Sequence, residues 1–121
     1  MGVAQWDEID FEFLGKAPNK VEINHTAAGQ KVRGKIVDLG FDSSKDFHDY
    51  AIDWSKTGIK WFVDGIKVYE TPPGTPLPKN PPYFFLTLWT GSKIEDSWMG
   101  PFVYKEPVTA EVAWAKYTPH E

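Results

Sequence analysis

Apolar and polar residues alternate with a period of two in several short runs along the chain, whereas helical periodicity is weak throughout. A period of two is typical of a β-strand with one buried face and one polar face. We therefore expect strands in the runs 5–15, 20–26, 31–40, 48–54, 59–71, 83–89 and 108–118.

Turn residues separate these runs. Asp64-Gly65 predicts a hairpin, because this dipeptide readily adopts the positive φ angles of a tight two-residue turn. The segment 72–82 holds six prolines, which cannot donate ladder hydrogen bonds, so we expect a loop there and a second loop at 90–102. The run 83–89 is almost entirely apolar and predicts a strand that is buried on both faces.

Many short strands with frequent turns predict an all-β fold, either an antiparallel sandwich or a barrel. With 121 residues, the span 1–121 has the size of a single domain. Hydrophobic residues make up 41% and aromatic residues 16% of the chain, which is enough for a packed core.

Composition excludes several classes of partner. The net charge is −4 and there is no basic patch, so we expect no nucleic acid as a partner. No apolar run approaches the roughly 20 residues of a membrane-spanning helix, so we expect no membrane partner. The chain has no cysteine and therefore no disulfide framework.

One strand has an unusual polar face. Glu8, Asp10 and Glu12 stand at alternate positions, and apolar residues lie between them. Three carboxylates on one face repel one another, so at least one pKa should rise. If one of these carboxyls is protonated while another is ionised, an enzyme can use the first as an acid and the second as a base or nucleophile. The alternative is the solvent-facing side of an edge strand.

The stretch "DEIDFEFLG" resembles the catalytic strand of glycoside hydrolase family 16, whose members cut or transfer β-glucans. The shared pattern is Glu-hydrophobic-Asp-hydrophobic-Glu. The pieces "FHDYAIDW", "IKWFVDG", "LTLWTG", "DSWMG" and "AEVAWAKYT" follow in the order found in the lichenases, the 1,3-1,4-β-glucanases. This resemblance implies a β-jelly-roll, a concanavalin-like antiparallel sandwich, of which this chain is expected to form a part.

The resemblance also implies roles for the acidic residues. Glu8 is the expected nucleophile, Glu12 the general acid/base, and Asp10 the residue that modulates their protonation. The implied reaction is a retaining hydrolysis of β-1,3-1,4-glucan. Four residues of strand separate the Cα atoms of Glu8 and Glu12 by roughly 13 Å. Because a retaining pair of carboxyls lies about 5–5.5 Å apart, the retaining mechanism rests on the resemblance rather than on spacing.

Three further residues correspond to substrate-binding positions of the lichenases. Trp6 and Trp89 would stack on sugar rings, and Asn24 would hydrogen-bond sugar hydroxyls. The alternatives are core packing for the two tryptophans and an ordinary polar position for Asn24.

The chain departs from the lichenase pattern at three positions. Thr87 and Thr26 replace an Asn and a Tyr of the cleft, which bears on the linkage preference. Ala113 replaces an Asp of the family's calcium site, so we expect no metal and no cofactor.

The family's catalytic domain is about twice as long as this chain. We therefore expect either a complementary N-terminal half chain or a homo-oligomer to cover unpaired strand edges. Two other functions remain open, a transglycosylase of the xyloglucan type and a non-catalytic glucan-binding or structural sandwich. A β-glucan substrate would place the protein outside the cell.

Overall fold

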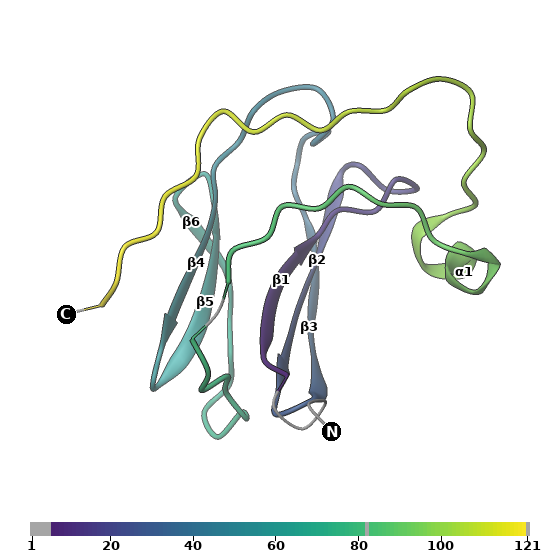
Figure 1. The fold of residues 1–121 in the computed structure, drawn as a ribbon. Helices are drawn as coiled ribbons and strands as arrows, with labels where there is room; N and C mark the ends of the chain where they lie inside the picture. The colour runs from purple at the N-terminus through teal and green to yellow at the C-terminus, as the bar shows by residue number, and fades with distance from the viewer. Residues whose placement is uncertain (1–5, 82, 121) are drawn as a thin grey trace.

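In the computed structural model, which describes residues 6–81 and 83–120, two three-stranded antiparallel sheets face each other (Figure 1). This arrangement confirms the predicted all-β antiparallel sandwich. No helix in the described residues is long and apolar enough to cross a membrane.

The first sheet has the order β1-β2-β3 and carries the acidic strand at one edge. Its strands are β1 (Glu8–Glu12), β2 (Lys20–Ala27) and β3 (Gln30–Asp38). A two-residue turn joins β2 to β3, in which Ala28 and Gly29 have φ angles of 50° and 78°. Positive φ at both positions gives the turn the twist that a tight hairpin requires.

The second sheet has the order β4-β5-β6. Its strands are β4 (Tyr50–Ser55), β5 (Gly58–Val63) and β6 (Ile66–Glu70). Asp64 and Gly65 form the turn between β5 and β6, with φ angles of 49° and 79°. The hairpin predicted at this dipeptide is therefore confirmed.

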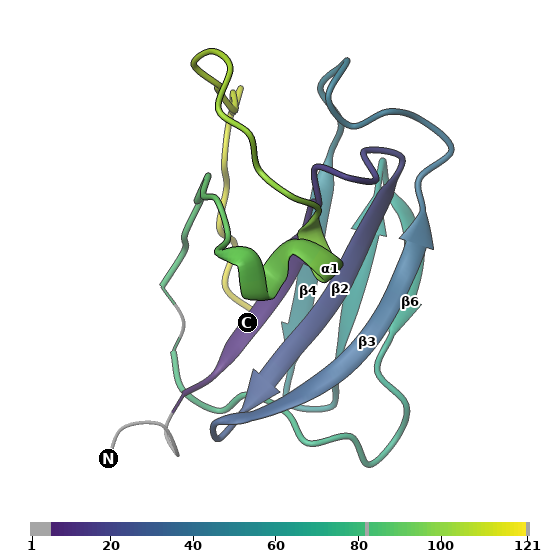
Figure 2. The same cartoon turned by 90° about the vertical axis from the view of Figure 1, so that its right-hand side faces the viewer.

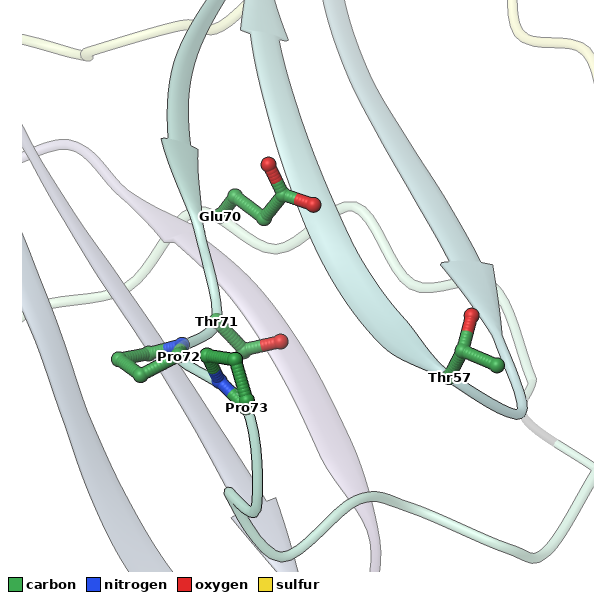
Figure 3. A pocket seen from close by; sticks show the side chains of 5 residues that line it. All are labelled: Thr57, Glu70, Thr71, Pro72 and Pro73. Atoms are coloured by element: carbon green, nitrogen blue, oxygen red, sulfur yellow. The ribbon is translucent and has the colours of Figure 1, made fainter.

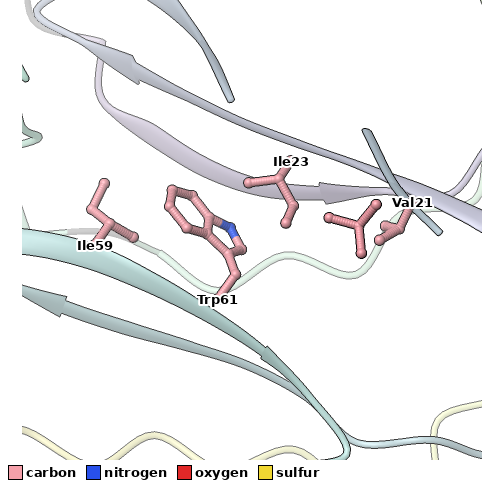
Figure 4. Close-up of a cluster of buried hydrophobic side chains, with 5 residues drawn as sticks. Val21, Ile23, Ile59 and Trp61 are labelled. Carbon is pink, nitrogen blue, oxygen red and sulfur yellow. The ribbon is translucent and has the colours of Figure 1, made fainter. Parts of the chain in front are cut away.

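The core lies between the inner faces of the two sheets (Figure 4). Trp61 on β5 is its largest side chain and is fully buried, and its indole Nε1 donates a hydrogen bond to the carbonyl oxygen of Asp10 at 3.1 Å. This bond ties β5 to the acidic strand, so the core directly supports the backbone of β1. The buried cluster consists of Val21, Ile23, Val37, Ile59 and Trp61.

Two predicted strands, 83–89 and 108–118, are wrong. Both segments lack strand structure, and their apolar side chains are exposed, 87% for Tyr83 and 66% for Trp114. They run along the side of the molecule where the edge strands β1 and β4 lie (Figures 1 and 2). A strand requires a neighbouring strand to share its ladder of hydrogen bonds, and the described residues supply none for these segments.

The loop predicted at 90–102 contains two short helical elements, η2 (Lys93–Glu95) and α1 (Asp96–Met99). The Ser92 side chain caps the start of η2. Figure 2 shows α1 in front of β1 and β2, against the face of the first sheet that is turned away from the core. This element therefore covers part of the acidic face.

Candidate active site

The three carboxylates of β1 share the outer face of the first sheet. β1 pairs with β2 so that Glu8 lies opposite Thr26, Asp10 opposite Asn24 and Glu12 opposite Glu22. Since side chains alternate along a strand, the residues between the carboxylates point to the core, and Ile9 and Phe11 pack there. The predicted grouping of the three acids on one face is present in the structure.

Asp10, the middle carboxylate, has the most strongly altered protonation. Its partial burial raises its pKa to about 7, and the charge of Glu8, a hydrogen bond with Glu8 and the charge of Glu12 act in the same direction. Lys31 opposes them. Near neutral pH Asp10 is therefore about half protonated, and its O–H can then donate to Glu8.

Glu12 also has a raised pKa, chiefly because it is partly buried. The Asn24 amide Nδ2 donates to Glu12 Oε2 at 2.5 Å, and this bond and the charge of Lys31 act to lower the pKa. The charges of Glu22 and Glu8 act to raise it. The balance favours the protonated form of Glu12 compared with a carboxyl in water.

Trp6 lies beside the first carboxylate. Its indole Nε1 donates to Glu8 Oε2 at 3.0 Å, and its carbonyl oxygen accepts a hydrogen bond from the Gly29 amide at 2.7 Å. The side chain is 56% exposed, so it is not a core residue. The indole can therefore orient Glu8 while its ring remains available to a ligand.

Asp7, the remaining acid of the stretch, has a structural role. Its carboxylate accepts hydrogen bonds from the backbone amides of Ala28, Lys79 and Asn80 at 2.7, 2.8 and 2.9 Å. Burial acts to raise its pKa, but these bonds together lower it. Asp7 thus anchors the start of β1 to the β2–β3 turn and to the proline-rich loop.

Asn24 is at the centre of the face, whereas Trp89 is at its margin. Asn24 is 1% exposed and contacts the carboxylate of Glu12. Trp89 is 54% exposed, and its ring centroid lies 6.3 Å from that of Trp98 in α1. Trp98 in turn donates from Nε1 to Glu22 at 2.6 Å. Trp98 and Glu22 thus connect Trp89 to the acidic face.

Sequence reasoning missed three residues of this face, Glu22, Lys31 and Trp98. The alternation in 20–26 does place Glu22 on the same face as Asn24, and this signal could have identified it. The position of Lys31 opposite Thr26 depends on the pairing of β2 with β3, which no local pattern specifies.

On the acidic face, Glu8 is exposed and Asp10 and Glu12 are partly buried. A separate hollow of about 470 Å³ lies at the end of the second sheet, where the side chains drawn in Figure 3 line it. It contains none of the three β1 carboxylates. In the described ranges 6–81 and 83–120, no group of three or more His, Cys, Asp or Glu side chains could hold a metal ion. The residues that line the hollow are Thr57, Glu70, Thr71, Pro72 and Pro73.

Known proteins are similar to this chain in both sequence and structure. The beta-glucanase of Paenibacillus polymyxa is 45% identical over 114 residues, which are 94% of this chain and 47% of that protein. The solved structure of a Bacillus licheniformis beta-glucanase superposes with a TM-score of 0.74 at 43% identity, covering 79% of this chain and 44% of that one.

A prokaryotic beta-1,3-1,4-glucanase (lichenase) from a mouse hindgut metagenome superposes with a TM-score of 0.71 at 42% identity, over 79% of this chain and 44% of that one. The chain thus spans about half the length of the curated relatives it matches. The family model for glycosyl hydrolases family 16 matches residues 1–116 of this chain. The chain therefore belongs to glycosyl hydrolases family 16.

Proposed function

We propose that this chain carries the catalytic strand of an endo-acting, retaining β-glucanase that hydrolyses β-1,3-1,4-glucan. The main support is the arrangement of Glu8, Asp10 and Glu12 on one face of the first sheet, with raised pKa values at Asp10 and Glu12. Retaining hydrolysis needs one carboxyl that gives up a proton and one carboxylate that attacks.

In the first step, Glu12 donates its proton to the glycosidic oxygen as the bond to the leaving sugar breaks. Glu8 attacks the anomeric carbon from the opposite face and forms a glycosyl ester. In the second step, Glu12, now ionised, takes a proton from water. The resulting hydroxide displaces Glu8 and releases the second sugar product.

Asp10 sets the protonation of this pair. When its carboxyl is protonated it can donate a hydrogen bond to Glu8, which holds the nucleophile in place. When it is ionised, its charge favours the protonated form of Glu12. Protonated Asp10 therefore acts on the nucleophile Glu8, and ionised Asp10 acts on the general acid Glu12.

The substrate class follows from the aromatic side chain next to the nucleophile and from the relatives. The half-exposed ring of Trp6 offers a flat surface beside Glu8 on which a sugar ring can stack. One of the similar solved structures is a beta-1,3-1,4-glucanase. A polymer of this kind is degraded outside the cell, so we place the activity there.

We also propose that turnover of substrate requires the part of the family fold that this chain does not supply. The exposed apolar side chains of 83–120 and the edge strands β1 and β4 have no covering strands among the described residues. We propose that a complementary polypeptide, or a second copy of the chain, covers them. The chain alone should then have weak activity, because substrate orientation supplies much of an enzyme's rate.

The test is reducing-sugar release from β-1,3-1,4-glucan, with and without the part of the Bacillus licheniformis relative that the superposition leaves uncovered. Release should depend on that part and fall by roughly 10³-fold or more in Glu8→Gln, which removes the nucleophile. Glu70→Gln on β6 is the matched control and should leave release unchanged. Release that persists in Glu8→Gln would refute the assignment.

A further inference from the structure

The Asn24 side chain joins two carboxylates. Its amide Nδ2 donates to Glu12 Oε2 at 2.5 Å and to Glu22 Oε1 at 3.2 Å. Glu12 belongs to β1 and Glu22 to β2, so one buried NH₂ group links the two strands across the acidic face. An amide nitrogen carries two hydrogens, and here each has a carboxylate acceptor.

The orientation of this amide is fixed. The Gly34 backbone N–H faces Asn24 Oδ1 at 3.4 Å, at the bulge where the β2–β3 register shifts. A Cβ at position 34 would lie 2.2 Å from the Ile23 carbonyl oxygen, so only glycine allows this close approach. A flipped amide would turn its oxygen toward two carboxylates and its NH₂ toward another donor.

Glu22 is itself held from the opposite side. Its Oε2 accepts the Trp98 indole N–H at 2.6 Å, while its Oε1 accepts from Asn24. The ammonium of Lys31 lies 5.7 Å from the Trp98 ring centroid, which steadies the indole by a cation–π contact. Glu22 therefore connects α1 to Asn24, and through Asn24 to Glu12.

We propose that Glu22 is a positioning residue for the reaction: it holds the Asn24 amide against Glu12, and its negative charge, kept in place by Trp98, favours the protonated form of Glu12. The inference rests on the proposed function, because that function gives Glu12 its role as general acid. Glu22 itself touches neither the glycosidic oxygen nor the anomeric carbon in this scheme.

The surrounding charges agree with this role. Partial burial acts to raise the pKa of Glu22, but hydrogen bonds from Trp98 and Asn24 lower it, as do the charges of two basic residues of β3. Because the pKa of Glu22 is lowered and that of Glu12 is raised, Glu22 loses its proton at a lower pH than Glu12 does. The charged or titratable groups that act on Glu12 are Glu8 and Asp10 on β1, Glu22 on β2 and Lys31 on β3, while Arg33 on β3 acts on Glu22.

The substitution Glu22→Gln removes the negative charge and keeps one acceptor oxygen. Both partners of Glu22 are donors, so a glutamine keeps an oxygen for Asn24 and loses the bond to Trp98. The Glu12 pKa should then fall, since a neighbouring negative charge has gone. Lys31→Gln should raise the same pKa, because it removes a positive charge. Trp98→Phe keeps the Glu22 charge and should lower the pKa less than Glu22→Gln.

The measurement is a carbon-detected NMR titration of the Glu12 carboxyl in the purified chain, which needs no activity. Glu70→Gln removes a negative charge from the other sheet and is the control, so it should leave the pKa of Glu12 unchanged. An unchanged or raised Glu12 pKa in Glu22→Gln would overturn the inference. Where the reconstituted chain turns over glucan, the basic limb of its kcat/KM profile should move to lower pH in Glu22→Gln with little change in KM. Absence of turnover would count against the proposed function alone.

Discussion

Residues 6–70 and residues 83–120 are both rich in aromatic and aliphatic side chains, but the two regions place them in opposite environments. Trp61 in the first region is fully buried, whereas Trp114 in the second is 66% exposed. The first region forms all six strands of the two sheets, and the second forms none. The difference shows that apolar content and alternation do not make a strand without a partner for its backbone.

The two regions also differ in whether each segment has a neighbouring segment in the sequence with which it can pair as a strand. Two-residue turns join β2 to β3, β4 to β5 and β5 to β6, so each of these pairs forms from chain neighbours. The segments 83–89 and 108–118 have no such neighbour. The second region contacts the first through a few isolated hydrogen bonds, such as the bond from the Trp98 indole to Glu22 and the bond from the Lys16 amide to the Met99 carbonyl oxygen.

The largest contrast is expected from matched tryptophan substitutions. Trp61→Ala should lower the free energy of unfolding by about 3–5 kcal/mol, because it empties the centre of the core and removes the bond to the Asp10 carbonyl. Trp114→Ala should change it by less than about 0.5 kcal/mol, since its ring is mostly exposed. Urea denaturation measures both. Equal losses at the two positions would mean that the second region is packed as tightly as the first.

A smaller change in the free energy of unfolding is expected from the substitution of Asp10, at the centre of the acidic face. Its folded-state pKa of about 7 exceeds its ordinary value of 3.8, so its carboxyl favours folding below about pH 4, and this contribution is lost as the pH rises through 7. Asp10→Asn stays neutral and should gain roughly 1–2 kcal/mol over the parent chain at pH 8, after allowance for solvent screening. Thermal unfolding between pH 4 and pH 8 measures the difference. A constant difference across that range would contradict the raised pKa.

Local patterns sufficed to predict much of the first region. The alternation around Glu8, Asp10 and Glu12 predicts which side chains share a face, and Asp64-Gly65 predicts the turn that the structure contains. Both depend only on residues adjacent in sequence, where the period of a strand and the φ preferences of a turn apply.

The rest depends on contacts between distant residues. The bulge at Gly34 aligns Asn24 with the carboxylates, and no local signal announces it. Trp98 reaches Glu22 across 76 positions of sequence, through a short helix in what was expected to be an irregular loop. The strands predicted at 83–89 and 108–118 failed for the same reason, since pairing is a property of two segments.

The most direct test of the central claim is to trap the intermediate on the acidic strand. The chain, mixed with the complementary part of the family fold, would be treated with a 2-fluoro β-glucan oligosaccharide that carries a good leaving group, and then digested and analysed by mass spectrometry. A retaining enzyme accumulates a glycosyl ester on its nucleophile. Our account predicts one 2-fluoro-oligosaccharyl group, the whole probe without its leaving group, on Glu8, and none in Glu8→Gln. A mixture that cleaves β-1,3-1,4-glucan but carries the label on another residue, or carries no label, would contradict it.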